Sequence, residues 1–177
     1  MRALLLLLCA GAAACGGDPP SCPQRVFPSS EPLPPGADGF ALAVGREDEG
    51  HAHVATPWQD GDRVGLVTGG QGGWMIRPAV DITTPARLDE LEGRYACVGV
   101  RMTAAVAGGA PVVIVSVAAE RQAATPSTYH VTPLFGLLGF DRTRLDGVST
   151  PLRFDVLTDG GDGGTAVTVV PDATLPP

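Results

Sequence analysis

The sequence contains no lysine and no asparagine, and it has few aromatic and few charged residues. All 12 basic residues are therefore arginines, aromatic residues make up 5% of the 177 positions and charged residues 18%. With 19 acidic residues the net charge is −7, a sign that argues against nucleic acid as a partner. The 24 glycines and 17 prolines follow no three-residue period, which excludes collagen. A coiled coil and a long helical bundle are excluded by the same composition, and the length suits one domain.

The motifs of common hydrolases are also missing. The chain has no Gly-x-Ser-x-Gly, no His-Glu-x-x-His and no lysine that could form a Schiff base. Ser127 and His130 are close in sequence, but three residues apart on a strand they face opposite sides. We therefore expect a protein that is not an enzyme and that needs no cofactor.

Residues 1–14 have the pattern of a secretory signal peptide. Arg2 supplies a positive charge, and an apolar stretch with five consecutive leucines follows it. The stretch is shorter than the roughly 20 residues that span a bilayer. The pattern predicts a leader that is cleaved on export.

The triplet Ala12-Ala13-Ala14, directly before Cys15, resembles the lipobox of bacterial lipoproteins. This resemblance implies that the Cys15 thiol is acylated and anchors the chain in a membrane. The absence of Asp after Cys15, where Gly16 stands, implies the outer membrane. Ala12 departs from the pattern, which prefers Leu there. The alternative is ordinary cleavage after Ala14, which releases an unanchored protein.

Two further cysteines, Cys22 and Cys97, remain for the folded part, and exported thiols usually oxidise. In residues 95–102 the apolar side chains alternate, which places Cys97 on the outer face of a strand. An N-terminal tail crossing that face would bring Cys22 to it. We expect one Cys22–Cys97 disulfide; the alternative is two reduced thiols.

Residues 15–39 form the predicted lipidated N-terminus and a tether, and residues 40–177 form the predicted domain. Prolines interleaved with serine, glycine and acidic residues give the tether an extended, non-helical character. A spacer that lifts the domain from the membrane is one interpretation. A tail packed down by the Cys22 bridge is the other, and the two are compatible.

Short runs rich in Val, Ile and Thr, separated by Gly, Pro and Asp, predict an all-β fold after residue 40. The pattern favours an immunoglobulin-like antiparallel β-sandwich of seven or eight strands, with at most one short connecting helix at 84–93. Pro78 predicts an edge or a bulge within 74–82. Residues 112–119, apolar on both faces, predict a central strand. The expected strands are 40–46, 62–68, 74–82, 95–103, 112–119, 128–135, 152–158 and 165–170.

Three histidines are candidate metal ligands. His51 and His53 are two residues apart in an acidic segment, and Zn²⁺ or Cu²⁺ would accept them with His130 or Met75 as further ligands. A solvated acidic loop is the competing interpretation. Asp159 and Asp162 in a glycine-rich loop do not match a calcium-binding loop, and we expect a hairpin turn there.

The segment Gly69-Gly70-Gln71-Gly72-Gly73 precedes Trp74 at the start of an expected strand. It is neither a Walker loop nor a dinucleotide fingerprint. Gln71 at the apex and Trp74 are a candidate ligand surface. Residues 59–76 as a whole resemble a signature of uncharacterised secreted proteins and lipoproteins from GC-rich Gram-negative bacteria. That resemblance implies export and a β-sandwich, and Met75 departs from it by replacing a frequent His.

Together these features predict a non-catalytic outer-membrane lipoprotein whose β-sandwich domain serves adhesion, envelope assembly or ligand binding. The expected partners are the membrane, through the lipid at Cys15, and an envelope protein or polysaccharide. The alternative is a periplasmic metal-binding or metal-chaperone domain that uses the His51/His53 pair.

Overall fold

The computed structural model describes residues 27–35, 41–50, 53–83, 97–120, 123–124, 128–131, 134–158 and 161–176. Several predicted segments lie outside these residues: the signal peptide, the short helix at 84–93, and the tether apart from residues 27–35. Cys15, Cys22, His51, Ser127 and Asp159 also lie outside them. Within the described ranges, no helix combines the length and apolar character needed to cross a membrane.

The described residues form thirteen β-strands and two short 3₁₀ turns. The first strands are β1 (Ala41–Glu47), β2 (Val54–Pro57), β3 (Arg63–Gly65), β4 (Val67–Thr68), β5 (Trp74–Ile76) and β6 (Ala79–Thr83). They are followed by β7 (Cys97–Ala104), η2 (Val106–Gly108), β8 (Val112–Glu120), β9 (Ala123–Ala124), β10 (Thr128–Val131), β11 (Gly136–Gly139), η3 (Arg142–Arg144), β12 (Thr150–Leu157) and β13 (Asp162–Asp172).

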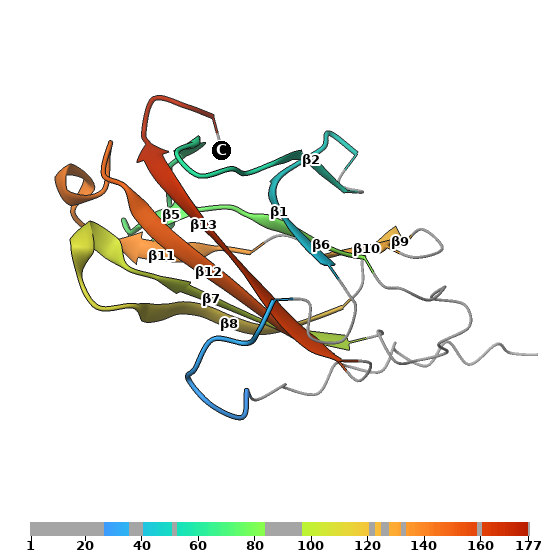
Figure 1. Cartoon of the computed structure of the whole chain (residues 1–177). Helices are drawn as coiled ribbons and strands as arrows, with labels where there is room; N and C mark the ends of the chain where they lie inside the picture. Colours follow the sequence, from blue (N-terminus) through green and yellow to red (C-terminus); the bar gives the residue numbers. More distant parts are fainter. Residues whose placement is uncertain are drawn as a thin grey trace, which may run out of the picture.

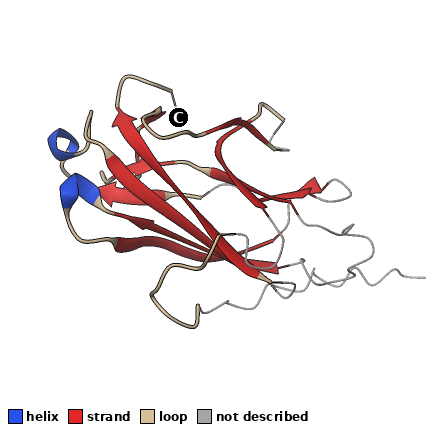
Figure 2. Cartoon of the chain, in the orientation of Figure 1, coloured by secondary structure: helices blue, strands red, loops and turns tan. Residues whose placement is uncertain are grey.

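These strands form three sheets that are arranged as two layers (Figures 1 and 2). One layer is the sheet β3-β13-β12-β7-β8. The other contains the sheet β2-β1-β6-β10-β9 and its shorter extension β11-β5-β4, which is continuous with it in the chain because only Arg77 and Pro78 separate β5 from β6. The all-β sandwich that the sequence predicts is confirmed.

The core lies between the layers and is contributed by alternate residues of the strands. Phe154 of β12, Met102 of β7, and Ile76 and Ile82 of β5 and β6 are each fully buried. Burial of aliphatic and aromatic side chains from both layers is the main force that holds the sheets together. The period-two pattern in the sequence thus corresponds to the inward faces of the strands.

Pro78 divides the strand that the sequence predicts at 74–82. Proline cannot donate to a strand ladder. The chain accordingly leaves the three-stranded sheet after Ile76 and enters the five-stranded sheet at Ala79. The predicted strand at 128–135 is similarly replaced by β10 and by β11, which begins only at Gly136. The sandwich therefore has more and shorter strands than the seven or eight expected.

The prediction of a central strand at 112–119 is wrong. In the described sheet β8 pairs only with β7 and lies at the edge. Val112 and Val113 are 54% and 50% exposed, whereas Ile114 packs against the core. A run of apolar residues does not distinguish a central strand from an edge strand that leaves some of them in solvent.

The closing hairpin is confirmed, with a shorter turn than expected. β12 and β13 pair antiparallel from Thr150–Val169 to Leu157–Asp162, so Asp162 and the glycines after it belong to the strand. A Cβ atom at Gly164 would lie 2.4 Å from the Arg153 guanidinium and 3.0 Å from the Leu33 carbonyl oxygen. The glycine is needed because the N-terminal segment crosses the strand at this point.

That N-terminal segment, residues 27–35, packs against the sheet and is here called the strap. Buried Arg101 of β7 donates to the carbonyl oxygens of Ser29 and Glu31, and its guanidinium lies 4.5 Å from the centre of the Phe27 ring. The N–H of Leu33 donates to Asp155 of β12 at 2.9 Å. Residues 27–35 of the predicted tether therefore pack against the domain, whereas Cys22, which the packed-tail interpretation relied on, lies outside the described residues. The strap crosses the outer face of β7, the strand that begins with Cys97, and the disulfide of Cys97 with Cys22 stays a prediction.

Candidate arginine pocket

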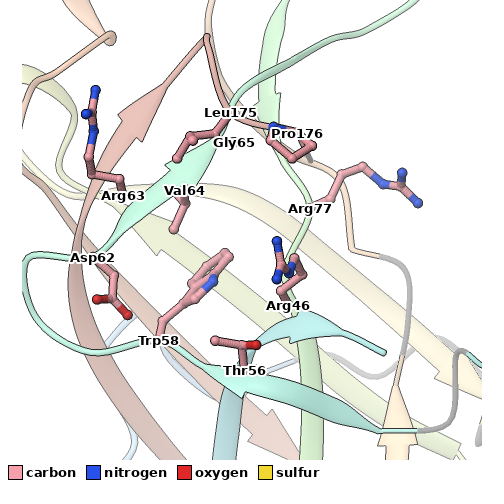
Figure 3. Close-up of a pocket in the computed structure, with 10 residues that line it drawn as sticks. All are labelled: Arg46, Thr56, Trp58, Asp62, Arg63, Val64, Gly65, Arg77, Leu175 and Pro176. Atoms are coloured by element: carbon pink, nitrogen blue, oxygen red, sulfur yellow. The ribbon is translucent and has the colours of Figure 1, made fainter. Parts of the chain in front are cut away.

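The candidate site is a hollow of about 290 Å³ where β1 and β2 of one layer meet β3 and the C-terminal residues of the other (Figure 3). Three of the twelve arginines of this acidic chain line it. The lining residues are Arg46, Thr56, Trp58, Asp62, Arg63, Val64, Gly65, Arg77, Leu175 and Pro176.

Arg46 and Trp58 form the centre of the hollow. Arg46 stands near the end of β1, directly opposite Thr56 of β2, and Trp58 is held by its backbone N–H, which donates to the Val44 carbonyl at 2.8 Å. Figure 3 shows the Arg46 guanidinium beside the indole and below Pro176. The indole packs on the core with its other side. A cation next to an apolar ring suits a ligand that carries an anionic group and an apolar part.

Arg63 at the rim is positioned by Asp172. Its guanidinium lies 2.6 Å from Oδ2 of Asp172, a side chain that is only 2% exposed. The N–H and hydroxyl of Thr174 donate to the other carboxylate oxygen at 2.9 and 2.7 Å. These two hydrogen bonds, and after them the charge of Arg63, hold the pKa of Asp172 below its usual range. Asp172 thus remains a carboxylate that pairs with the largely exposed Arg63 and holds the chain at Thr174, just before the C-terminal residues of the pocket.

Arg77 connects the pocket to the neighbouring strand. It follows β5 directly, and its guanidinium lies 5.2 Å from the centre of the Phe135 ring. In Figure 3 the side chain points away from Trp58. It is exposed. Arg77 therefore adds positive charge to one rim of the hollow and extends toward β11.

The turn at 59–62 sets the entrance to β3. The N–H of Gln59 donates to the Asp62 side chain at 2.8 Å, and Gly61 has a φ of +91°. A positive φ of this kind favours glycine. Asp60 accepts from the Thr168 N–H at 2.7 Å, which fastens the turn to β13. Asp60-Gly61-Asp62, within the residues 59–76 that carry the resemblance, therefore forms a turn before a short strand.

The two residues of the predicted ligand surface are separated. Gln71 lines a second hollow of about 220 Å³ together with Gly69, Gly70, Gly73, Met75, Leu137 and Phe140. Trp74 instead packs against the core, with the Arg142 guanidinium 5.6 Å from its ring centre. Neighbouring residues of a strand point to opposite faces, which explains why Met75 reaches the hollow and Trp74 does not.

His53 and His130 lie in different environments. The His53 side chain is 61% exposed and 3.5 Å from Asp48. His130 is buried, with Nδ1 2.5 Å from Asp81 and Nε2 3.2 Å from Glu47. Because both of its ring nitrogens already face carboxylates, neither is directed at a metal.

In the described part of the chain, no group of three or more His, Cys, Asp or Glu side chains could hold a metal ion. His51 lies outside those residues, so the metal-binding alternative stays a prediction that metal titration would test.

The arginine pocket could not be found from local sequence signals. Its lining residues come from β1, from β2 and Trp58 after it, from Asp62 and β3, from Arg77 and from the C-terminus, and no spacing relates them. The only hint in the composition is that basic residues are scarce and all arginine. No protein-family model, no curated protein and no solved structure shows a significant match to the chain.

Proposed function

We propose that the protein is an exported, lipid-anchored and non-catalytic binding domain that presents the arginine pocket to an anionic ligand of the cell envelope. Envelope polysaccharides, lipids and acidic proteins all carry such groups. The β-sandwich provides a rigid support for the pocket, and loops and strand ends on rigid supports are common places for ligand sites.

The observation that carries the proposal is the state of Arg46. Among the described residues no carboxylate lies within ion-pair distance of its guanidinium, in contrast to Arg63, which is paired with Asp172. A guanidinium offers several N–H donors in a planar arrangement that fits carboxylate or phosphate oxygens. An external anion would therefore supply the partner that the fold does not.

The anchoring part of the proposal rests on Cys15. We expect an alkyne fatty acid fed to producing cells to label the wild-type protein and to leave Cys15→Ala unlabelled. Equal labelling of the two proteins would end the lipoprotein interpretation, and it would leave the pocket untouched.

The binding part is tested by titrating the full chain, with Cys15→Ser to keep it free of lipid, with benzoate and with neutral benzyl alcohol. A Trp74→Phe background leaves Trp58 as the only tryptophan and so as the reporter of the pocket. We expect benzoate to change the Trp58 fluorescence saturably and benzyl alcohol to do so far more weakly. Arg46→Ala should weaken benzoate binding about tenfold, equivalent to about 1.4 kcal/mol.

Arg144→Ala is the matched control, because Arg144 is also exposed and does not line the pocket. It should bind benzoate as the parent protein does. Equal affinity for the acid and the alcohol, or an Arg46→Ala variant as tight as the control, would refute an anion site.

A further inference from the structure

The outer face of the three-stranded sheet β11-β5-β4 is built of two rows of side chains. Leu137, Met75 and Val67 are register partners across the three strands. Two residues along the chain from these positions are Phe135, Arg77 and Gly65: the Arg77 guanidinium contacts the Phe135 ring, and Arg77 and Gly65 both line the pocket. The rows are about 7 Å apart along the strands.

This outer face is apolar where a sandwich normally presents polar residues to water. Phe135, Leu137 and Phe140 are 46%, 39% and 67% exposed. Scattered apolar side chains on a surface are ordinary, but neighbouring ones around a hollow mark a binding surface. We call the set Phe135, Leu137, Met75 and Phe140 the apolar strip.

The apolar strip is continuous with the arginine pocket. Gly65 and Arg77, in one row, line the pocket, whereas Met75 and Leu137, in the next row, line the second hollow. The Arg77 guanidinium lies 5.2 Å from the centre of the Phe135 ring, so a residue of the strip contacts an arginine that lines the pocket. A single ligand lying along the strands would meet arginine first and apolar side chains next.

The far end of the strip is closed by the glycine-rich loop. A Cβ atom at Gly73 would lie 2.4 Å from Cδ1 of Leu137 and 3.3 Å from the Phe140 ring. Glycine at this position lets the two side chains lie close to the loop, and Gln71 of the same loop lines the hollow with them. The loop therefore gives the strip an end wall about two rows from the arginines.

We propose, resting on the function proposed above, that the ligand is a single-chain anionic amphiphile: its carboxylate or phosphate binds in the arginine pocket, and its acyl chain lies along the apolar strip to the glycine-rich loop. The arginines are the complement of the head group in a chain that is otherwise acidic. The apolar strip is the complement of the ligand's acyl chain. Because the strip is open to solvent on one side, it suits a single acyl chain lying on the surface.

The test is a chain-length series on the same Trp74→Phe, Cys15→Ser protein. Butyrate, octanoate and dodecanoate are titrated below their micelle concentrations, with dodecyl phosphate as a second head group. We expect affinity to rise about threefold to tenfold for each added pair of methylenes, since burying a methylene is favourable and the strip is open on one side. Dodecanol should bind more weakly than dodecanoate.

Variants separate the head-group site from the strip. Leu137→Asp and Phe140→Asp change exposed side chains and should abolish the chain-length dependence while benzoate still binds. Arg46→Ala should weaken every member of the series. Val112→Asp, at an exposed valine of the edge strand, is the matched control and should leave the series unchanged.

The outcomes distinguish the two proposals. Anion binding that does not depend on chain length would overturn the amphiphile and leave the anion pocket standing. Absence of any anion binding would overturn both. Binding to vesicles containing anionic phospholipid, without binding of monomeric dodecanoate, would overturn the single-chain ligand and identify the strip as a membrane contact.

Discussion

His130→Ala is expected to lower the free energy of unfolding by about 3–5 kcal/mol, because it leaves a cavity and two largely buried carboxyl groups without their hydrogen-bond partner. The ring is buried and lies between Asp81 and Glu47, whose side chains are only 12% and 15% exposed. Each ring nitrogen lies within hydrogen-bond distance of one of these carboxyl groups. Removal of the ring leaves two carboxylates facing each other across a cavity.

Urea unfolding of the Cys15→Ser chain, followed by tryptophan fluorescence, measures this effect. His53→Ala is the control, because its side chain is mostly exposed, and it should change stability by less than about 0.5 kcal/mol. If His130→Ala is as stable as His53→Ala, the three-residue cluster does not hold β1, β6 and β10 together. The backbone N–H of Val54 in β2 also donates to Asp81 at 2.9 Å, so β2 is attached to the same cluster.

Arg101→Leu is expected to release the strap and to lower the free energy of unfolding by about 3 kcal/mol, toward the low end for breaking a buried ion pair. Arg101 and Asp155 are 5% and 2% exposed and face each other in the β7–β12 register. Arg153 still neutralises Asp155 in the variant, which moderates the loss. The carbonyls of Ser29 and Glu31, however, lose their donor.

Hydrogen exchange read by mass spectrometry on the peptide that covers 27–35 measures the release, and urea unfolding measures the loss of stability. Arg142→Leu breaks an arginine–aspartate pair at the surface, where the side chains are 46% and 31% exposed. It should cost about 1 kcal/mol or less and leave the strap protected. Protection of 27–35 unchanged in Arg101→Leu would show that the strap is held by other contacts.

The docked strap also limits the reach of the proposed anchor. If Cys15 carries lipid, residues 16–26 alone separate it from the strap, instead of the whole of 16–39. Extended at about 3.1 Å per residue, that stretch spans about 34 Å. The domain would then stay close to the membrane surface, within reach of amphiphiles that leave it.

Much of the scaffold was predictable from local pattern. Alternation predicted the inward faces of the strands and the terminal hairpin, and proline's missing N–H predicted the disruption at Pro78. Both signals act within a few residues. The position of β8 at the sheet edge was not predictable, because a run of apolar residues is compatible with an edge strand and with a central strand.

The net charge of the chain did not predict the local positive charge of the candidate site. A net charge of −7 predicts a surface that repels anions, yet the fold gathers Arg46, Arg63 and Arg77 around Trp58. Net charge averages over the surface, whereas a binding site depends on the few charges within several ångströms. Sequence inspection named Gln71 and found its loop, and it missed the arginines entirely.

The sequence by itself determined that this protein is all-β and where its strands turn, because backbone preference and alternating burial are properties of neighbouring residues. The tertiary structure alone decided which distant residues meet: the strap under Arg101, His130 between two carboxylates, and the arginines beside an apolar strip. These contacts depend on how the layers pack and on the registers between strands, and no short stretch of the sequence contains that information.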